Sequence, residues 1–100
     1  VVFHALDRDH GKDAIRKWWL DFKSVVRSRI PKGSCVIGCC DANARIGSVV
    51  SNSVGDWCRA TEDQAGMHFH ELCLESQWWV PSTFFESMQE VSCVTFAKDK

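Results

Sequence analysis

The sequence predicts a mixed α/β fold in which strands alternate with amphipathic helices. A short β-branched run at residues 1–5 and an apolar run at residues 35–40 lie on either side of a segment whose large apolar residues recur every three or four positions. This order of strand, helix and strand is typical of a right-handed βαβ unit with parallel, buried strands. The length of 100 residues allows one small domain.

The N-terminal elements are the clearest. Residues 1–5 suit a buried strand, and the polar residues after it form a loop. A helix is expected from Asp13 to Arg29, ended by Pro31 and Gly33, before a second strand at residues 35–40. The apolar face of this helix consists of Ile15, Trp18, Trp19, Phe22, Val25 and Val26.

The C-terminal half is less regular. Residues 44–63 are rich in Gly, Ser, Asn and Asp and predict a long irregular loop, a kind of segment that often carries function. A strand is expected at residues 78–80, leading into 81–85, and an edge strand at 92–96. After the loop and before these strands, a helix is predicted from Gln64 or Gly66 to about Ser76. Its packing residues are expected to be Met67, Phe69 or His70, Leu72 and Cys73.

Charge and hydropathy exclude some partners. The chain has 12 Lys and Arg against 13 Asp and Glu, a formal net charge of −1, so no bulk attraction to nucleic acid is expected. No apolar run reaches the roughly 20 residues of a membrane span, and no membrane partner is expected. The candidate for a locally basic face consists of Arg16, Lys17, Lys23, Arg27, Arg29 and Lys32.

The cysteines favour a reduced, intracellular protein. The sequence contains six, at positions 35, 39, 40, 58, 73 and 93, without a C-x-x-C pair or a metal-ligand spacing to the histidines. Three of them fall in the second predicted strand, where cysteine behaves as a small hydrophobic residue. We therefore expect structural thiols, neither disulfides nor a zinc site.

Polar residues follow the two predicted parallel strands. Asp41 and Asn43 come directly after the second strand, and His4 ends the first. Ligand sites of parallel sheets form beyond the carboxyl ends of their strands, so the three side chains are expected to converge. A carboxylate can activate water, an amide can bind a phosphoryl oxygen, and a histidine can stabilise developing negative charge. This set suits phosphodiester hydrolysis assisted by Mg²⁺ or Mn²⁺.

Each of these residues also has a structural interpretation. Asp-x-Asn after a strand is commonly turn chemistry, because both side chains bond to nearby backbone. A single histidine at a strand end is usually structural. His68 and His70 are two residues apart on the second predicted helix, so they face apart and cannot chelate one metal. His70 is expected to pack or to cap a loop, and His10 to be exposed.

The order and spacing of several motifs resemble the endonuclease/exonuclease/phosphatase family. The likeness is closest to the endonuclease domain of LINE-type (non-LTR) retroelement reverse-transcriptase polyproteins. It covers residues 1–85 and extends more faintly to Phe96. The motifs are "VVFHA", "CVIGCCDANARIG", "VG", "AGMHFHELCLES" and "WWVPSTFF".

The resemblance implies a function and roles for three residues. Asp41 would position or activate the attacking water, Asn43 would orient the phosphate, and His4 would stabilise charge. Arg45 and Gly47 extend the same motif, and Thr83 and Phe84 would match the strand after the second helix. The implied activity is Mg²⁺- or Mn²⁺-dependent cleavage of DNA. The partner is DNA, no small-molecule cofactor is implied, and the nucleus is the candidate compartment.

The resemblance also implies an incomplete site. The family fold is a four-layer α/β sandwich with two sheets packed face to face, so residues 1–100 would be a partial domain from inside a longer chain, inactive alone. A metal-binding Glu would precede residue 1, and an Asp and a terminal Asp-His pair would follow residue 100.

Several positions depart from the family pattern. Leu6, Cys40 and Ala42 stand where Pro, Gly and Phe are usual, Ala65-Gly66 replaces Asn-Gly, and residues 94–96 match only loosely. These departures suit a divergent or decaying copy. The alternatives are therefore a degenerate relic or a small non-enzymatic α/β interaction module. Family members act on DNA, RNA or phosphoinositides, and no residue here selects among them.

Overall fold

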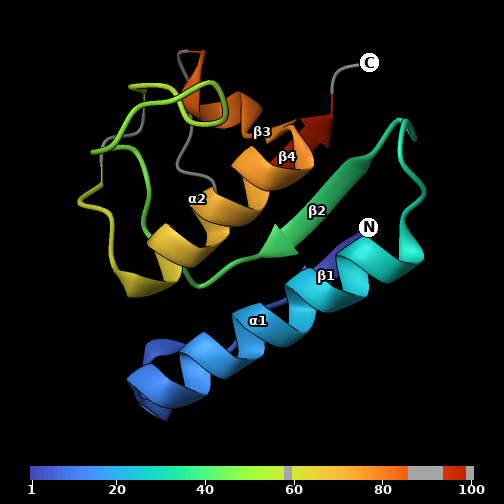
Figure 1. Ribbon diagram of the computed structural model, residues 1–100. Coiled ribbons are helices and arrows are strands. Elements are labelled where there is room, and N and C mark those ends of the chain that lie inside the picture. Colours follow the sequence, from blue (N-terminus) through green and yellow to red (C-terminus); the bar gives the residue numbers. More distant parts are fainter. Residues whose placement is uncertain (58–59, 86–93, 99–100) are drawn as a thin grey trace.

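The computed structural model describes residues 1–57, 60–85 and 94–98, and it has a mixed α/β fold (Figure 1). The described residues contain two α-helices and four strands, with short 3₁₀ helices at Arg8–His10 and Pro81–Thr83. The elements are β1 (Val2–His4), α1 (Lys12–Arg29), β2 (Ile37–Asp41), α2 (Gln64–Ser76), β3 (Trp78–Trp79) and β4 (Val94–Lys98).

The four strands form one mixed sheet in the order β1-β2-β4-β3. β1 and β2 are parallel, as predicted, with Val2 opposite Cys39 and His4 opposite Asp41. The expectation of an edge strand near residues 92–96 is wrong, because β4 pairs antiparallel with β2 on one side and with β3 on the other. Residues 92 and 93 of that predicted strand lie outside the described residues.

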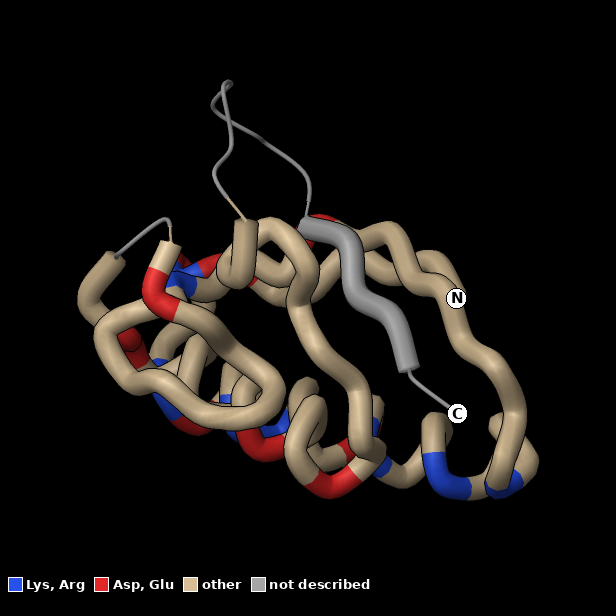
Figure 2. The backbone as a smooth tube through the Cα atoms, turned by 90° about the horizontal axis from the view of Figure 1, so that it is seen from above, with Lys and Arg blue, Asp and Glu red and all other residues tan. Residues whose placement is uncertain are grey.

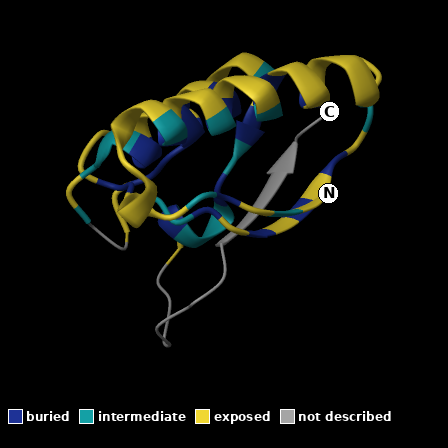
Figure 3. Cartoon of the chain, turned by 90° about the horizontal axis from the view of Figure 1, so that it is seen from below, coloured by how far each residue is buried: buried dark blue, intermediate teal, exposed yellow. Residues whose placement is uncertain are grey.

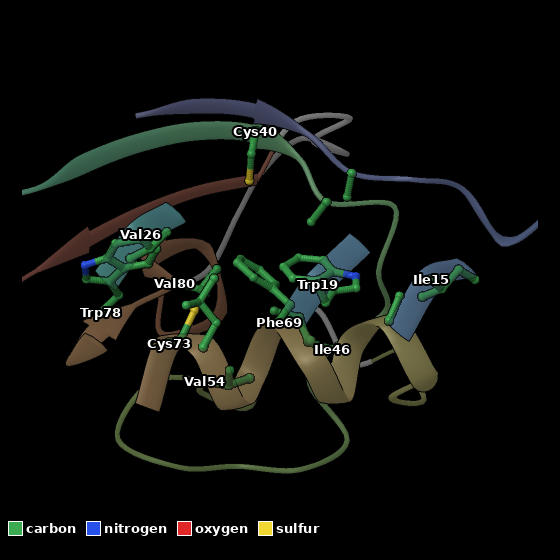
Figure 4. Packing of buried hydrophobic residues seen from close by; sticks show 14 of the residues in the cluster. Ile15, Trp19, Val26, Cys40, Ile46, Val54, Phe69, Cys73, Trp78 and Val80 are labelled. Atoms are coloured by element: carbon green, nitrogen blue, oxygen red, sulfur yellow. The ribbon is translucent and has the colours of Figure 1, made fainter. Parts of the chain in front are cut away.

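Both helices pack on the same face of the sheet, and the core lies between the two layers (Figure 4). Phe3 of β1 points into this layer, with its ring 6.0 Å from Trp19 of α1 and 6.3 Å from Phe69 of α2. Trp19 and Phe69 are themselves 5.6 Å apart. The three rings therefore join strand, first helix and second helix in one cluster.

The strands are buried on one face only, which corrects the expectation of fully buried parallel strands. Alternate residues of β2 are exposed and buried, and Ile37 is 76% exposed. Val2 of β1 is 86% exposed. Figure 3 shows this alternation along the two strands. The reason is that α1 and α2 both cover the Phe3 side, so among the described residues no element covers the opposite side.

Both helices begin and end within one or two residues of the predicted limits. Ile30 is extended before Pro31, which disfavours helical geometry in the residue that precedes it. Asp63 caps α2 by accepting a hydrogen bond from the Gly66 N–H at 2.7 Å. On α2 the predicted packing of Met67 is wrong, since this side chain is 44% exposed, whereas Phe69 and His70 are both buried.

The basic face predicted on the first helix is largely neutralised. Lys17 pairs with Asp21 at 3.2 Å, and Arg27 pairs with Glu75 of α2 at 2.6 Å. The side chain of Lys23 is only 8% exposed, and its ammonium lies 3.2 Å from Glu71. Figure 2 shows basic and acidic positions interspersed on the helical side. Within the described parts of the chain, no helix is long and apolar enough to cross a bilayer.

Four cysteines fall within the described residues, and none of these four forms a disulfide bond. Cys40 and Cys73 are buried, and burial raises the pKa of the Cys73 thiol far above its usual range. Cys35 and Cys39 are exposed, so the interpretation of this run as uniformly buried small residues holds only for Cys40. Cys58 and Cys93 lie outside the described residues.

Candidate functional site

His4 and Asp41 lie side by side where the two parallel strands end. They are directly opposite in the strand register, so both side chains project from the face that the helices leave open. His4 Nε2 is 3.6 Å from Asp41 Oδ2, and the two side chains are 76% and 52% exposed. The sheet thus brings together two residues that are 37 positions apart in the sequence.

Asn43 joins this pair through a tight turn. Its backbone N–H donates to Asp41 Oδ1 at 3.2 Å, and its Nδ2 donates to the Ala5 carbonyl at 2.7 Å. The residue has φ 44°, a left-handed conformation that asparagine tolerates better than most residues. The turn interpretation of Asp-x-Asn is therefore correct, and the same turn places Asn43 beside the end of β1.

The geometry leaves several groups open to a ligand. Asp41 Oδ1 is used by the turn, whereas Oδ2 faces His4 on an exposed surface. Only one of the two amide hydrogens of Asn43 is needed for the bond to Ala5. A carboxylate oxygen, an amide and an imidazole can thus reach one bound group, as general acid–base chemistry requires.

These residues do not by themselves form a metal centre. Within residues 1–57, 60–85 and 94–98, no group of three His, Cys, Asp or Glu side chains could hold a metal ion. Asp41 is the only carboxylate at the end of β2, and the Asn43 oxygen could add one neutral ligand. Mg²⁺ is commonly bound through one or two carboxylates with waters and substrate phosphates, so a metal here would need further oxygen ligands.

A small cavity of about 230 Å³ opens beside Asn43. Asp7, Arg8, Arg45 and Asp63 contribute to its lining. A hydrogen bond from His10 holds the pKa of the Asp7 carboxyl below its usual value, and the Asp9 N–H adds to this effect. Arg8 lies in a stretch that the sequence marks only as a polar loop, and no sequence signal distinguishes it from its neighbours.

His70 fixes the long loop, as expected. Its Nε2 lies 2.6 Å from Ser51 Oγ, and its Nδ1 lies 2.7 Å from Glu62 Oε1. This order of hydroxyl, imidazole and carboxylate resembles that of serine hydrolases. However, Ser51 Oγ also accepts the backbone N–H of Ser53 at 3.0 Å, so the hydroxyl oxygen is part of a turn. We therefore interpret the three side chains as a clamp that joins loop 44–63 to α2.

Ser51 and Glu62 were not identified from the sequence. Both lie in an irregular segment without periodicity, and neither has a fixed spacing from His70. Only the fold shows that they contact the same imidazole.

Two glycines of the motifs make close backbone contacts. A Cβ at Gly55 would overlap the carbonyl oxygen of Thr83, and one at Gly66 would overlap that of Arg45. Thr83 is buried, accepts the Gly55 N–H at 2.8 Å and donates to the Val80 carbonyl at 2.6 Å. Thr83 thus lies in a 3₁₀ helix and not in the expected strand, and these contacts give it a structural role.

Comparisons of the chain with protein-family models, with curated proteins and with solved structures found no match. The resemblance to the endonuclease/exonuclease/phosphatase family stays a prediction from the sequence motifs.

Proposed function

We propose that this chain is part of a divalent-metal-dependent endonuclease that hydrolyses phosphodiester bonds of DNA, of the kind carried by LINE-type retroelements. The observation that carries the proposal is the convergence of His4, Asp41 and Asn43 at the carboxyl ends of two parallel strands. Ligands bind at this end of parallel sheets, and the three side chains have the chemistry that phosphodiester hydrolysis needs.

The roles follow from the exposed atoms. The exposed Oδ2 of Asp41 orients the attacking water and takes its proton, and His4 donates to the phosphoryl oxygen on which charge develops. Asn43 is held by Ala5 and Asp41, so its remaining amide hydrogen binds the phosphate in a fixed orientation. Mg²⁺ or Mn²⁺, when bound with further oxygen ligands, would supply neutralisation of phosphate charge.

The open face of the sheet supports a partial domain. Val2 and Ile37 are 86% and 76% exposed. Cys39, which lies opposite Val2 and two residues after Ile37, is also exposed. Large apolar residues side by side on a sheet normally pack against another layer. A second sheet on this face would give the expected four-layer sandwich and would bring further acidic residues to the site.

The test is nicking of supercoiled plasmid DNA in Mg²⁺ by a longer protein that contains residues 1–100. Replacing Asp41→Asn should lower the nicking rate at least about 100-fold, because a positioned general base contributes roughly that factor or more. Asp21→Asn is the matched control, since Asp21 is an exposed acid on α1, away from the candidate site, and pairs with Lys17 at 3.2 Å. Equal nicking by Asp41→Asn and the control would contradict the role of Asp41.

The second candidate is a non-enzymatic α/β interaction module or a relic. One observation favours it: the Asp41–Asn43 turn is already satisfied by its own backbone and by Ala5. The coding sequence on either side separates the two candidates. A strand ending in an acid upstream, with Asp and then Ser-Asp-His downstream, favours the enzyme, whereas stop codons or frameshifts favour the relic.

A further inference from the structure

Two adjoining cavities extend from Asn43 along the surface. The one of about 230 Å³ beside Asn43 shares Arg8, Arg45 and Asp63 with a second of about 390 Å³. The second continues past Lys12 to the first residues of α2. The lining of the two together therefore forms one groove that starts at the candidate site and runs between α1 and α2.

The acids of this groove already have hydrogen-bond partners. Asp7 Oδ1 accepts from His10 and from the Asp9 N–H. Glu62 is bound by His70 at 2.7 Å. Asp63 Oδ1 accepts the backbone N–H of Gly66 and that of Arg45, at 2.7 and 3.0 Å.

The basic side chains of the groove differ from its acids in how they are paired. In the part of the chain that the structure describes, Arg8, Lys12 and Arg45 form no ion pair, although Lys17, Lys23 and Arg27 on α1 all do. Formal charge in the lining is balanced, with three bases and three acids, so net charge alone does not select an anion. Preference for a phosphate would come from the guanidinium N–H donors of Arg8 and Arg45, because a guanidinium presents a planar pair of donors that matches two phosphate oxygens.

We propose that Arg8 and Arg45 bind the DNA backbone phosphates next to the scissile one, so that the cleaved strand lies along this groove. The inference rests on the proposed function and names how its substrate is held. Asn43 lines one end of the groove and is also a residue of the candidate site, where it bonds to Asp41. The DNA strand therefore has a continuous path from the site into the groove. Both arginines would act by positioning the strand, with no part in proton transfer.

The experiment measures binding of a fluorescein-labelled DNA duplex to the 100-residue chain by anisotropy, from about 50 to about 200 mM salt. The test variant is Arg8→Gln with Arg45→Gln. The control is Arg29→Gln with Lys32→Gln, which removes the same charge from exposed residues at the other end of α1. Thermal melting followed by circular dichroism checks that both variants stay folded.

The test variant should flatten the slope of log affinity against log salt by about one per arginine, and weaken binding roughly tenfold per arginine near 0.1 M salt. The control should change the slope by less than half of that. Equal effects in both variants, or no duplex binding by the unaltered chain, would overturn the proposal.

Asp41→Asn separates this proposal from the proposed function. It should not weaken duplex binding, because it removes a negative charge from beside the phosphate, whereas nicking by the longer protein is lost. If the longer protein does not nick DNA, yet the Arg8 and Arg45 variant still flattens the slope, the endonuclease proposal fails and the phosphate groove stands.

Discussion

The two faces of the sheet differ in what they contribute. On the covered face, Phe3 and Cys40 pack against Trp19 and Phe69, in an almost fully buried cluster. On the open face, apolar residues remain in solvent, and His4 and Asp41 lie at its end. The inward side chains of the two strands therefore stabilise the βαβ unit, whereas their outward side chains include the candidate site residues.

The largest effect expected is from removing the central ring of the covered face. Trp19→Ala should lower the free energy of unfolding by about 3–5 kcal/mol, because Trp19 is fully buried and leaves a large cavity. Urea denaturation followed by circular dichroism measures this loss.

Trp19→Phe is the matched control. The indole Nε1 of Trp19 is buried with no hydrogen-bond partner among the described residues, so phenylalanine removes an unsatisfied donor together with part of the ring. We expect this variant to lose less than half as much stability as Trp19→Ala. If Trp19→Ala cost no more than Trp19→Phe, the covered face would not be the stabilising one.

The elements that pack were predictable from the sequence, since burial on one face imposes periodicity. The spacing from Ile15 to Val26 located α1, and the run before Asp41 located β2 within two residues. The same periodicity could not reveal that only one face of the strands is covered. The run at residues 35–40 is apolar on both faces, so its pattern predicts that both faces are buried whether or not a second layer is present.

Part of the candidate site was predictable and part was not. Parallel strands bring their carboxyl ends to one edge, which placed His4 beside Asp41 from topology alone. The groove residues Arg8, Lys12 and Arg45 come from three separate segments without a shared pattern. Their common feature is their place in the lining of one groove, and only the folded chain shows it.

A smaller effect on stability is expected from His68, which lies on the covered side. Its ring nitrogens are buried and have no hydrogen-bond partner in the part of the chain that the structure describes. Burial lowers the pKa of the imidazole, Glu71 opposes this shift, and Lys23 and Arg16 add to it. The folded state therefore holds His68 neutral. Its contribution to stability is present above the unfolded pKa of about 6.5 and is lost as the pH falls through the lower folded value.

His68→Phe should remove this part of the pH dependence. Urea unfolding at a series of pH values from about 7.5 to about 5 should give a shallower loss of stability in the variant than in the unaltered chain. The other histidines are the same in both proteins, so the difference between the two curves isolates His68. Parallel curves would show that water reaches the His68 imidazole in the folded state, contrary to its buried position.

The smallest effect is expected on the open face, and a pair of neighbouring residues tests it. Ile37 is 76% exposed and Val36 is 6% exposed. In the 100-residue chain, Ile37→Thr should change stability by less than about 0.5 kcal/mol, because threonine keeps the β-branched shape on an exposed strand. Val36→Thr should cost about 1–3 kcal/mol, since it buries a hydroxyl.

The same pair then reports on what covers the open face. If a second sheet packs there in a longer protein, Ile37→Thr should become as costly as Val36→Thr in that protein, because both positions are then buried. If the two variants already cost the same in the 100-residue chain, a second copy covers the face, and the cost of Ile37→Thr should fall on dilution. If Ile37→Thr has a small effect on stability in both proteins, the sandwich is removed from the proposal. The convergence of His4, Asp41 and Asn43 is then its only support.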